Sequence, residues 1–161
     1  MVVHWPNGIW EPGLRHAPVH FIDFLPTLAE VAGAPMLGER EGVGLSRPEG
    51  ESFVPSFRQP EWRRSEPIWF EHEGNRALRE GNWKLVSRHP GRWELYNMET
   101  DRTELNDLAD RESARVSRMA AAWDHTASRV GVRPSLSQVW DGVAGWHADR
   151  ARDLRARLVP R

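Results

Sequence analysis

The sequence contains no cysteine, a single lysine and no long hydrophobic run, and each absence narrows the possible functions. Without cysteine the chain has no disulfide, no thiolate metal site and no cysteine nucleophile, and its redox compartment is undefined. Lys84 is the lone lysine, so arginine supplies nearly all of the positive charge. Because no apolar run reaches the length of a membrane span, we expect no membrane partner.

The overall charge argues against nucleic-acid binding. The formal net charge is −1, whereas a general nucleic-acid binder carries a strong basic excess, so we expect no nucleic-acid partner. A hydrophobic fraction of 39% and a charged fraction of 28% are typical of a soluble globular chain. The opening MVVHWPNG has neither the basic nor the long apolar region of a signal peptide, and the compartment stays unknown.

The first part of the chain shows one strand-like run and one helix. Residues 1–5 form a short apolar run that stops at the turn signal of residues 6–8. Asp23 is the expected N-cap of a helix that ends at residues 33–35. The apolar face of this helix comprises Leu25, Leu28, Ala29 and Ala32. Residues 36–66 are rich in glycine, proline and charge, and we expect a long surface connection there.

From Pro67 the hydrophobic period changes to two, which predicts a sheet. Four strand-length runs follow, at residues 68–72, 75–79, 83–87 and 93–97. The intervening turn signals are Glu73-Gly74, Glu80-Gly81-Asn82 and His89-Pro90-Gly91. Such short turns join neighbouring antiparallel strands, so the pattern predicts a four-stranded antiparallel meander.

A long helix is predicted after the polar loop METDRTELNDLADRE, residues 98–112, which we call the return. Asp110 is its expected cap and Gly131 its expected stop. Its apolar stripe comprises Val116, Met119, Ala120, Trp123, Ala127 and Val130. We expect this stripe to lie across the sheet, because a four-stranded sheet needs one side covered. The Arg-rich tail, residues 132–161, shows a weaker helical stripe. The fold class is therefore α+β.

Three blocks of sequence resemble one known family. VVHWPNGIWEPGLRHAPVHFIDFLPTLAEVAGAP resembles a passage in which a strand ends in Trp-Pro-x-Gly and an Asp-x-x-Pro-Thr-Leu helix follows. HEGNRALREGNWKLV and WELYNMETDRTELNDLA resemble the end of the same family. The family is the type I sulfatases, the arylsulfatase-like branch of the alkaline-phosphatase superfamily. The blocks occur in family order over roughly residues 1 to 131, and the tail from Val132 does not take part in the resemblance.

The resemblance implies a two-part fold. Residues 1–35 would be the last strand and helix of a large α/β sulfatase domain, and residues 36–66 a connecting loop. Residues 67–131 would be the small C-terminal antiparallel sheet with its helix, followed by the tail, residues 132–161. The chain would thus be the C-terminal portion of a sulfuric ester hydrolase.

The resemblance also implies cofactors that this chain does not carry. The family uses a formylglycine made from Cys or Ser in a Cys/Ser-x-Pro-x-Arg motif, supported by a calcium ion. Both sites precede the Trp-Pro-x-Gly passage, so we expect no catalytic residue and no metal ligand here. Ser46 is followed by Pro48 but has Gly50 where the motif requires arginine, and is interpreted as a loop serine.

Other polar residues invite alternative interpretations. His16 and His20 are separated by Pro18 and lack the glutamate of a His-Glu-x-x-His zinc site. The carboxylates at Asp101, Glu104 and Asp107 lack the spacing of a calcium loop, and solvated turn carboxylates are the expectation.

One stretch raises the question of a substrate contact. In a complete sulfatase the first strand of the small domain lies close to the substrate cleft. His72, Asn75 and Arg76 would then form the cleft edge. The alternative is that these residues only support the Glu73-Gly74 turn.

Two hypotheses for the whole chain follow. In the first, it is the C-terminal fragment of an arylsulfatase, and its partner is the missing N-terminal sulfatase domain, in the same parent chain or as a separate polypeptide. A sulfate ester would then bind only to the complete enzyme. In the second, it is a non-catalytic α+β module, derived from a sulfatase, that binds a partner through an exposed apolar face. A strand-like run that starts at Met1 without a polar lead-in favours the first.

Overall fold

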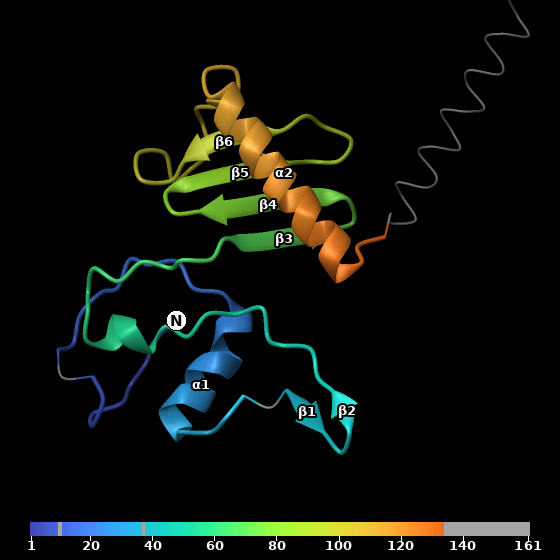
Figure 1. The fold of residues 1–161 in the computed structure, drawn as a ribbon. Coiled ribbons are helices and arrows are strands. Elements are labelled where there is room, and N and C mark those ends of the chain that lie inside the picture. Colours follow the sequence, from blue (N-terminus) through green and yellow to red (C-terminus); the bar gives the residue numbers. More distant parts are fainter. Residues whose placement is uncertain (10, 37, 134–161) are drawn as a thin grey trace, which may run out of the picture. The chain divides into compact units, whose positions relative to one another are not determined.

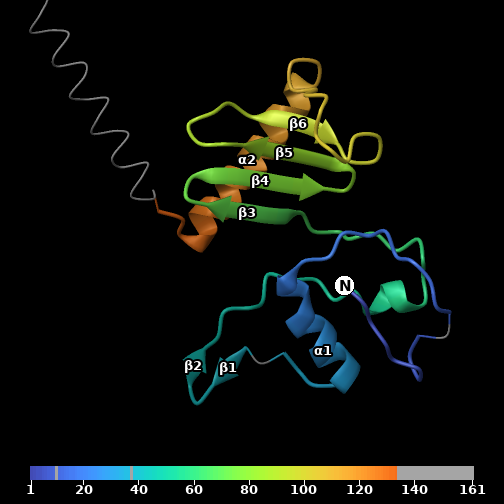
Figure 2. The same cartoon turned by 180° about the vertical axis from the view of Figure 1, so that it is seen from behind.

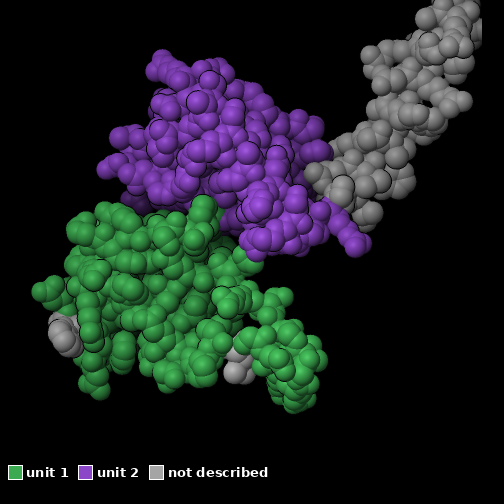
Figure 3. All heavy atoms as spheres, viewed as in Figure 1, with its two compact units in different colours: residues 1–68 green, residues 69–161 purple. Residues whose placement is uncertain are grey.

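The computed structural model describes residues 1–9, 11–36 and 38–133, arranged in two compact units. Unit 1 comprises Met1–Ile68 and unit 2 comprises Trp69–Arg161 (Figure 3). Unit 1 includes both the segment 1–35 and the segment 36–66, which the sequence predicts to be a domain end and a connecting loop. The weak helical stripe expected in the tail falls on residues after 133, which lie outside the described part of the chain.

The predicted meander is confirmed as a four-stranded antiparallel sheet. Its strands are β3 (Ile68–His72), β4 (Asn75–Glu80), β5 (Trp83–Ser87) and β6 (Glu94–Asn97), hydrogen-bonded in that order. Leu78 lies opposite Leu85, and Leu85 lies opposite Leu95. This register aligns three leucines from three strands on one face, where all three are buried.

Two-residue turns set the register of the first two hairpins. Glu73 and Gly74, between β3 and β4, both have positive φ, at 51° and 85°. Gly81, the first turn residue between β4 and β5, has a φ of 55°. Hairpin turns of this length need positive φ because only that twist matches the flanking strands. The glycines therefore make these turns possible.

The helix α2 (Ser113–Val130) covers one face of the sheet, as expected (Figure 1). The opposite face, seen from behind in Figure 2, has no helix across it among the described residues. Gly131 ends α2 in the left-handed conformation with a φ of 72°, as predicted. The expected cap at Asp110 is wrong: the N-cap is Glu112, without a side-chain hydrogen bond. Asp110 is exposed and lies 3.6 Å from Arg92.

A tryptophan cluster joins α2 to the edge of the sheet. The rings of Trp69 and Trp123 stack with centroids 5.2 Å apart. Each indole N–H donates to a backbone carbonyl, that of Trp69 to Trp123 and that of Trp123 to Phe70. Buried tryptophan is stable when its N–H finds such a partner, so these bonds fix how the helix lies on β3.

Unit 1 is built around α1 (Phe24–Ala32), which Gly33 ends in the left-handed conformation. Phe24, Phe53 and Phe57 pack edge to face in sequence, and Trp5 packs against Phe57. The buried Phe53 and Phe57 show that the expected surface connection partly forms the core of this unit. The strand expected at residues 1–5 is not formed within the described part of the chain.

The remaining regular structure of unit 1 is short. The strands β1 (Glu39–Arg40) and β2 (Val43–Gly44) form a small antiparallel hairpin. Short 3-10 helices occupy Phe21–Asp23 and Val54–Phe57. Among the described residues, no helix combines the length and apolar character that crossing a membrane requires.

Candidate functional site

Asp23, the first residue of the Asp-x-x-Pro-Thr pattern at the start of α1, is the most buried polar side chain among the described residues of unit 1. Asp23 is fully buried, and its carboxylate accepts hydrogen bonds from the backbone N–H of His20 at 2.7 Å and of Glu51 at 2.9 Å. Thr27 donates from its hydroxyl to the Asp23 carbonyl and accepts from the Phe53 amide at 3.1 Å. The side chains of Asp23 and Thr27 thus bind the backbone of residues 51–53, and their role is structural.

Arg64 balances the charge of this buried carboxylate. Its Nη1 lies 2.5 Å from Asp23 Oδ2, and both side chains are almost completely buried. Burial alone would raise the pKa of Asp23, but the bond from Arg64 and those from the two amides outweigh it. The pKa of Asp23 is therefore held below its ordinary value. This ion pair joins residues 41 positions apart and was not predicted from the sequence.

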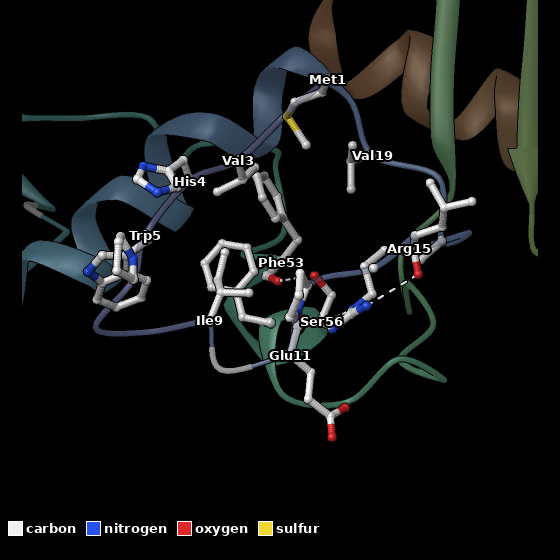
Figure 4. Close-up of a pocket in the computed structure, with 16 residues that line it drawn as sticks. Met1, Val3, His4, Trp5, Ile9, Glu11, Arg15, Val19, Phe53 and Ser56 are labelled. Atoms are coloured by element: carbon white, nitrogen blue, oxygen red, sulfur yellow. Dashed lines mark hydrogen bonds between the residues drawn. The ribbon is translucent and has the colours of Figure 1, made fainter.

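A cavity of about 480 Å³ lies beside this framework within unit 1 (Figure 4). Its lining is mainly apolar and includes Val3, Ile9, Val19 and Phe53. Arg15 reaches across one side and donates from Nε to the Ser56 carbonyl at 2.8 Å. Glu11 is the one carboxylate among the described residues that line this cavity, so these residues do not supply the paired carboxylates of a catalytic centre.

The three residues expected at a cleft edge do not form one cluster. Asn75 is occupied by backbone groups: its Nδ2 donates to the His72 carbonyl at 2.9 Å, and its Oδ1 accepts from the His89 amide at 3.1 Å. His72 is exposed at the end of β3. Arg76 lies on the α2 side of the sheet with Leu78, because alternate strand residues share a face. The cleft-edge role stays a prediction.

Arg76 packs within the tryptophan cluster. Its Cζ lies 4.2 Å from the ring centroid of Trp93 and 5.3 Å from that of Trp123, and its Nη2 donates to Ser87 Oγ at 3.3 Å. A guanidinium over indole faces is stabilised by the ring quadrupole. A cavity of about 370 Å³ adjoins Arg76 and includes Glu71 and Asp124 in its lining. Charges of both signs line it, so it favours no single ligand class.

Within the described residues, the Ser46 segment differs from the motif from which the family makes formylglycine. An added Cβ at Gly50 would lie 2.0 Å from the Ile22 carbonyl oxygen, so the arginine of the motif cannot replace this glycine after Ser46. In the described ranges, no group of three or more His, Asp or Glu side chains could hold a metal ion. His20 instead receives a long hydrogen bond, 3.5 Å, from the Ile22 amide at its Nδ1.

Two carboxylates of the loop after β6 accept hydrogen bonds from backbone amides. Asp101 accepts from the backbone amides of Leu105 and Asn106. Asp107 accepts from the amides of Leu95 and Ala109 at 3.0 and 2.9 Å. Burial would raise the pKa of Asp107, but these bonds and the nearby Arg92 lower it overall. These carboxylates fix backbone geometry.

The ion pair of Arg64 and the packing of Arg76 against the tryptophan rings were not predicted from the sequence. Both depend on contacts between residues far apart in the chain, and periodicity carries no information about such contacts. One signal was available: the spacing Asp-x-x-Pro-Thr places Asp23 and Thr27 on the same helix face, where two polar groups need partners.

Known proteins resemble this chain over most of its length. It is 31% identical over 144 residues to choline-sulfatase of Rhizobium meliloti (strain 1021), a match covering 80% of this chain and 27% of that protein. Arylsulfatase K of Danio rerio is 29% identical over 124 residues, covering 66% of this chain and 22% of the relative. The chain thus spans about a quarter of the length of these relatives. No protein-family model matches it.

A solved structure supports the same relationship. The crystal structure of Ps i-CgsB in complex with k-i-k-neocarrahexaose superposes with a TM-score of 0.65 at 26% sequence identity. That match covers 77% of this chain and 27% of the other. The resemblance inferred from the three sequence blocks is confirmed: the chain belongs to the sulfatases, of which it represents the C-terminal portion.

Proposed function

We propose that this chain supplies the C-terminal subdomain of an arylsulfatase-like sulfuric ester hydrolase whose catalytic groups lie in a larger sulfatase portion. The observation that carries the proposal is the match to choline-sulfatase, which covers 80% of this chain but only 27% of that protein. The chain accounts for about a quarter of such a protein, so its role is that of a part.

The surface of α1 supports this role. Leu25 and Leu28, one helical turn apart, are 59% and 64% exposed, and Phe21 just before the helix is 80% exposed. We call Phe21, Leu25, Leu28 and Val31 the α1 stripe. Apolar side chains at this spacing normally pack against another layer of a domain. We assign this layer to the missing N-terminal sulfatase domain.

The chemistry required for sulfate ester hydrolysis supports the same division. A nucleophile and groups that neutralise the sulfate oxygens are needed. The chain has no cysteine, and Ser46 lies in an incomplete motif. Under this proposal, formylglycine and calcium belong to the N-terminal portion, and a sulfate ester binds only to the complete enzyme. The chain contributes structure and, through the predicted set His72, Asn75 and Arg76, of which His72 is exposed at the end of β3, an edge of the cleft.

The experiment compares the native protein with the isolated chain. An antibody against residues 67–131 is used to isolate the native protein from its source cells, and its mass and its hydrolysis of a chromogenic aryl sulfate are measured. We expect an active species that is larger than 18.5 kDa, or an 18.5 kDa chain with a second polypeptide bound. The recombinant 161-residue chain is expected to be inactive.

Two results would contradict the proposal. Turnover by the recombinant chain, retained in Ser46→Ala and after calcium removal, would place catalytic groups within it. An inactive native protein of 18.5 kDa without a bound polypeptide would favour the non-catalytic module, an alternative that the sulfatase relatives do not favour.

A further inference from the structure

The sheet face opposite α2 carries a row of polar residues. Leu78 points to the α2 side, so its neighbour Arg79 points to the opposite face. In the register of the sheet, Arg79 lies across from Lys84 and Lys84 from Tyr96. Two cations thus oppose each other directly on adjacent strands, an arrangement that destabilises a sheet unless anions compensate it.

Arg79 lacks a compensating anion within the described chain. It is half-buried, and its Nε is buried without a hydrogen-bond acceptor. No ion pair joins Arg79 or Arg102 to a carboxylate among the residues described. Burial and, to a lesser degree, the positive charge of Arg102 lower the pKa of Arg79. Both influences disfavour its charged form, as expected of a cation without a counter-ion.

The neighbouring carboxylates are already occupied. Glu104 accepts from Lys84 Nζ, which neutralises the second cation of the row. Glu94 accepts from the Tyr96 hydroxyl at 2.6 Å. Glu80 lies on the other face, where it pairs with Arg118 on α2. Arg79 is therefore the cation of this row that remains without an anionic partner in the described part of the chain, and Arg102, whose charge acts on Arg79, forms no ion pair there either.

The loop that carries Arg102 is fixed on both sides. Asp101 binds the amides of Leu105 and Asn106, and Glu104 is held to Lys84. Glu104 also has a φ of 58°, an unfavourable conformation for a residue other than glycine. Backbone strain of this kind persists only where the surroundings impose it, and it occurs often at ligand sites. The fixed loop thus keeps Arg102 close enough for its positive charge to lower the pKa of Arg79.

We propose that Arg79 and Arg102 together form an oxyanion-binding site on the open face of the sheet, for a carboxylate or a sulfate group. Guanidinium groups present paired N–H donors that match the oxygens of both anions. A bound oxyanion would neutralise the two cations and give the partly dehydrated Arg79 its missing partner. The site is separate from the cleft edge assigned to His72, and it does not depend on the sulfatase proposal.

Titrations of the full chain with sodium sulfate and with sodium acetate, at ionic strength held constant with sodium chloride, test the site. We expect a saturable rise in Tm of about 2–4 °C with at least one of the two anions. The Arg79 Nε–H resonance should shift along the same binding curve. The rise should disappear in Arg79→Gln and in Arg102→Gln, and Arg79→Lys should retain only part of it.

Arg111→Gln is the matched control, because Arg111 is exposed and belongs to the same return without lying in the row. It should respond as the wild type does, since sulfate also stabilises proteins nonspecifically. Saturation by acetate would identify a carboxylate side chain as the ligand class, and saturation by sulfate alone a tetrahedral anion. An equal rise in wild type and Arg79→Gln, or an Arg79 resonance that does not move with either anion, would overturn the proposal.

Discussion

At the residue scale, Asp23 has the most consequential environment in unit 1. As the residue before α1 it was predicted to cap the helix, but its carboxylate accepts no bond from α1. It instead binds Arg64 and the amides of His20 and Glu51, which lie in three different segments. The Asp23 side chain therefore connects three segments of unit 1 through its hydrogen bonds and its ion pair.

We predict that Asp23→Asn destabilises the chain by about 3–5 kcal/mol, the usual cost of removing one partner of a buried ion pair. The amide can still receive a hydrogen bond, but the Arg64 charge stays buried without its counter-ion. Urea denaturation followed by tryptophan fluorescence measures the loss. Glu61→Gln, at an exposed ion pair with Arg63, is the control and should change the stability by less than about 0.5 kcal/mol. Equal midpoints for the two variants would contradict the prediction.

Acid should weaken the fold through the same carboxylate. Its folded-state pKa is lowered, so its contribution is complete above the unfolded value, about 3.9, and is lost as the pH falls through the folded value. Asp107 and Glu80, whose pKa values are also lowered, act in the same direction. Urea midpoints should stay level between pH 7 and 5 and fall below about pH 4. Asp23→Asn should show a smaller decrease, and a midpoint that rises on acidification would refute the assignment.

At the element scale, local signals were sufficient for unit 2 and insufficient for unit 1. Period-two runs separated by tight turns fix both the strands and their register, so the meander and its covering helix were predicted from sequence. The core of unit 1 depends on Phe53 and Phe57, which lie in a stretch without periodicity. Residues 1–5 have strand-like composition, but a strand forms only when a neighbouring strand supplies hydrogen bonds.

The turn between β3 and β4 offers a stabilising substitution. Glu73 holds a φ of 51°, which costs an ordinary L-residue about 1–2 kcal/mol, whereas asparagine tolerates this region and Asn-Gly is favoured in such turns. We predict that Glu73→Asn raises the free energy of unfolding by about 0.5–1 kcal/mol. Thermal unfolding measures the gain, and Glu61→Asn on the surface should give none. A loss of stability would mean that the Glu73 side chain makes a contact of its own.

At the scale of the whole molecule, the two units differ in how completely they bury their apolar groups. In unit 2 the sheet and α2 enclose the three leucines together with Met119 and Trp123. In unit 1 the segment from Phe21 to Ala32 buries Asp23 and Thr27 on one side and presents the α1 stripe to solvent on the other. The choline-sulfatase relative is about four times as long as the matched region, and under the proposed function the rest of a sulfatase would cover this stripe.

Replacing the stripe should therefore leave the isolated chain folded. We predict that Leu25→Gln with Leu28→Gln changes the free energy of unfolding by no more than about 0.5 kcal/mol for each site, because both side chains are exposed. The double variant should also scatter less light at high concentration, since an apolar patch has been removed. Phe53→Ala, on the buried side of the same unit, is the contrasting variant and should cost about 3–5 kcal/mol. If the double variant were instead as unstable as Phe53→Ala, the stripe would be buried within the chain itself, and its assignment to a missing sulfatase domain would have to be withdrawn.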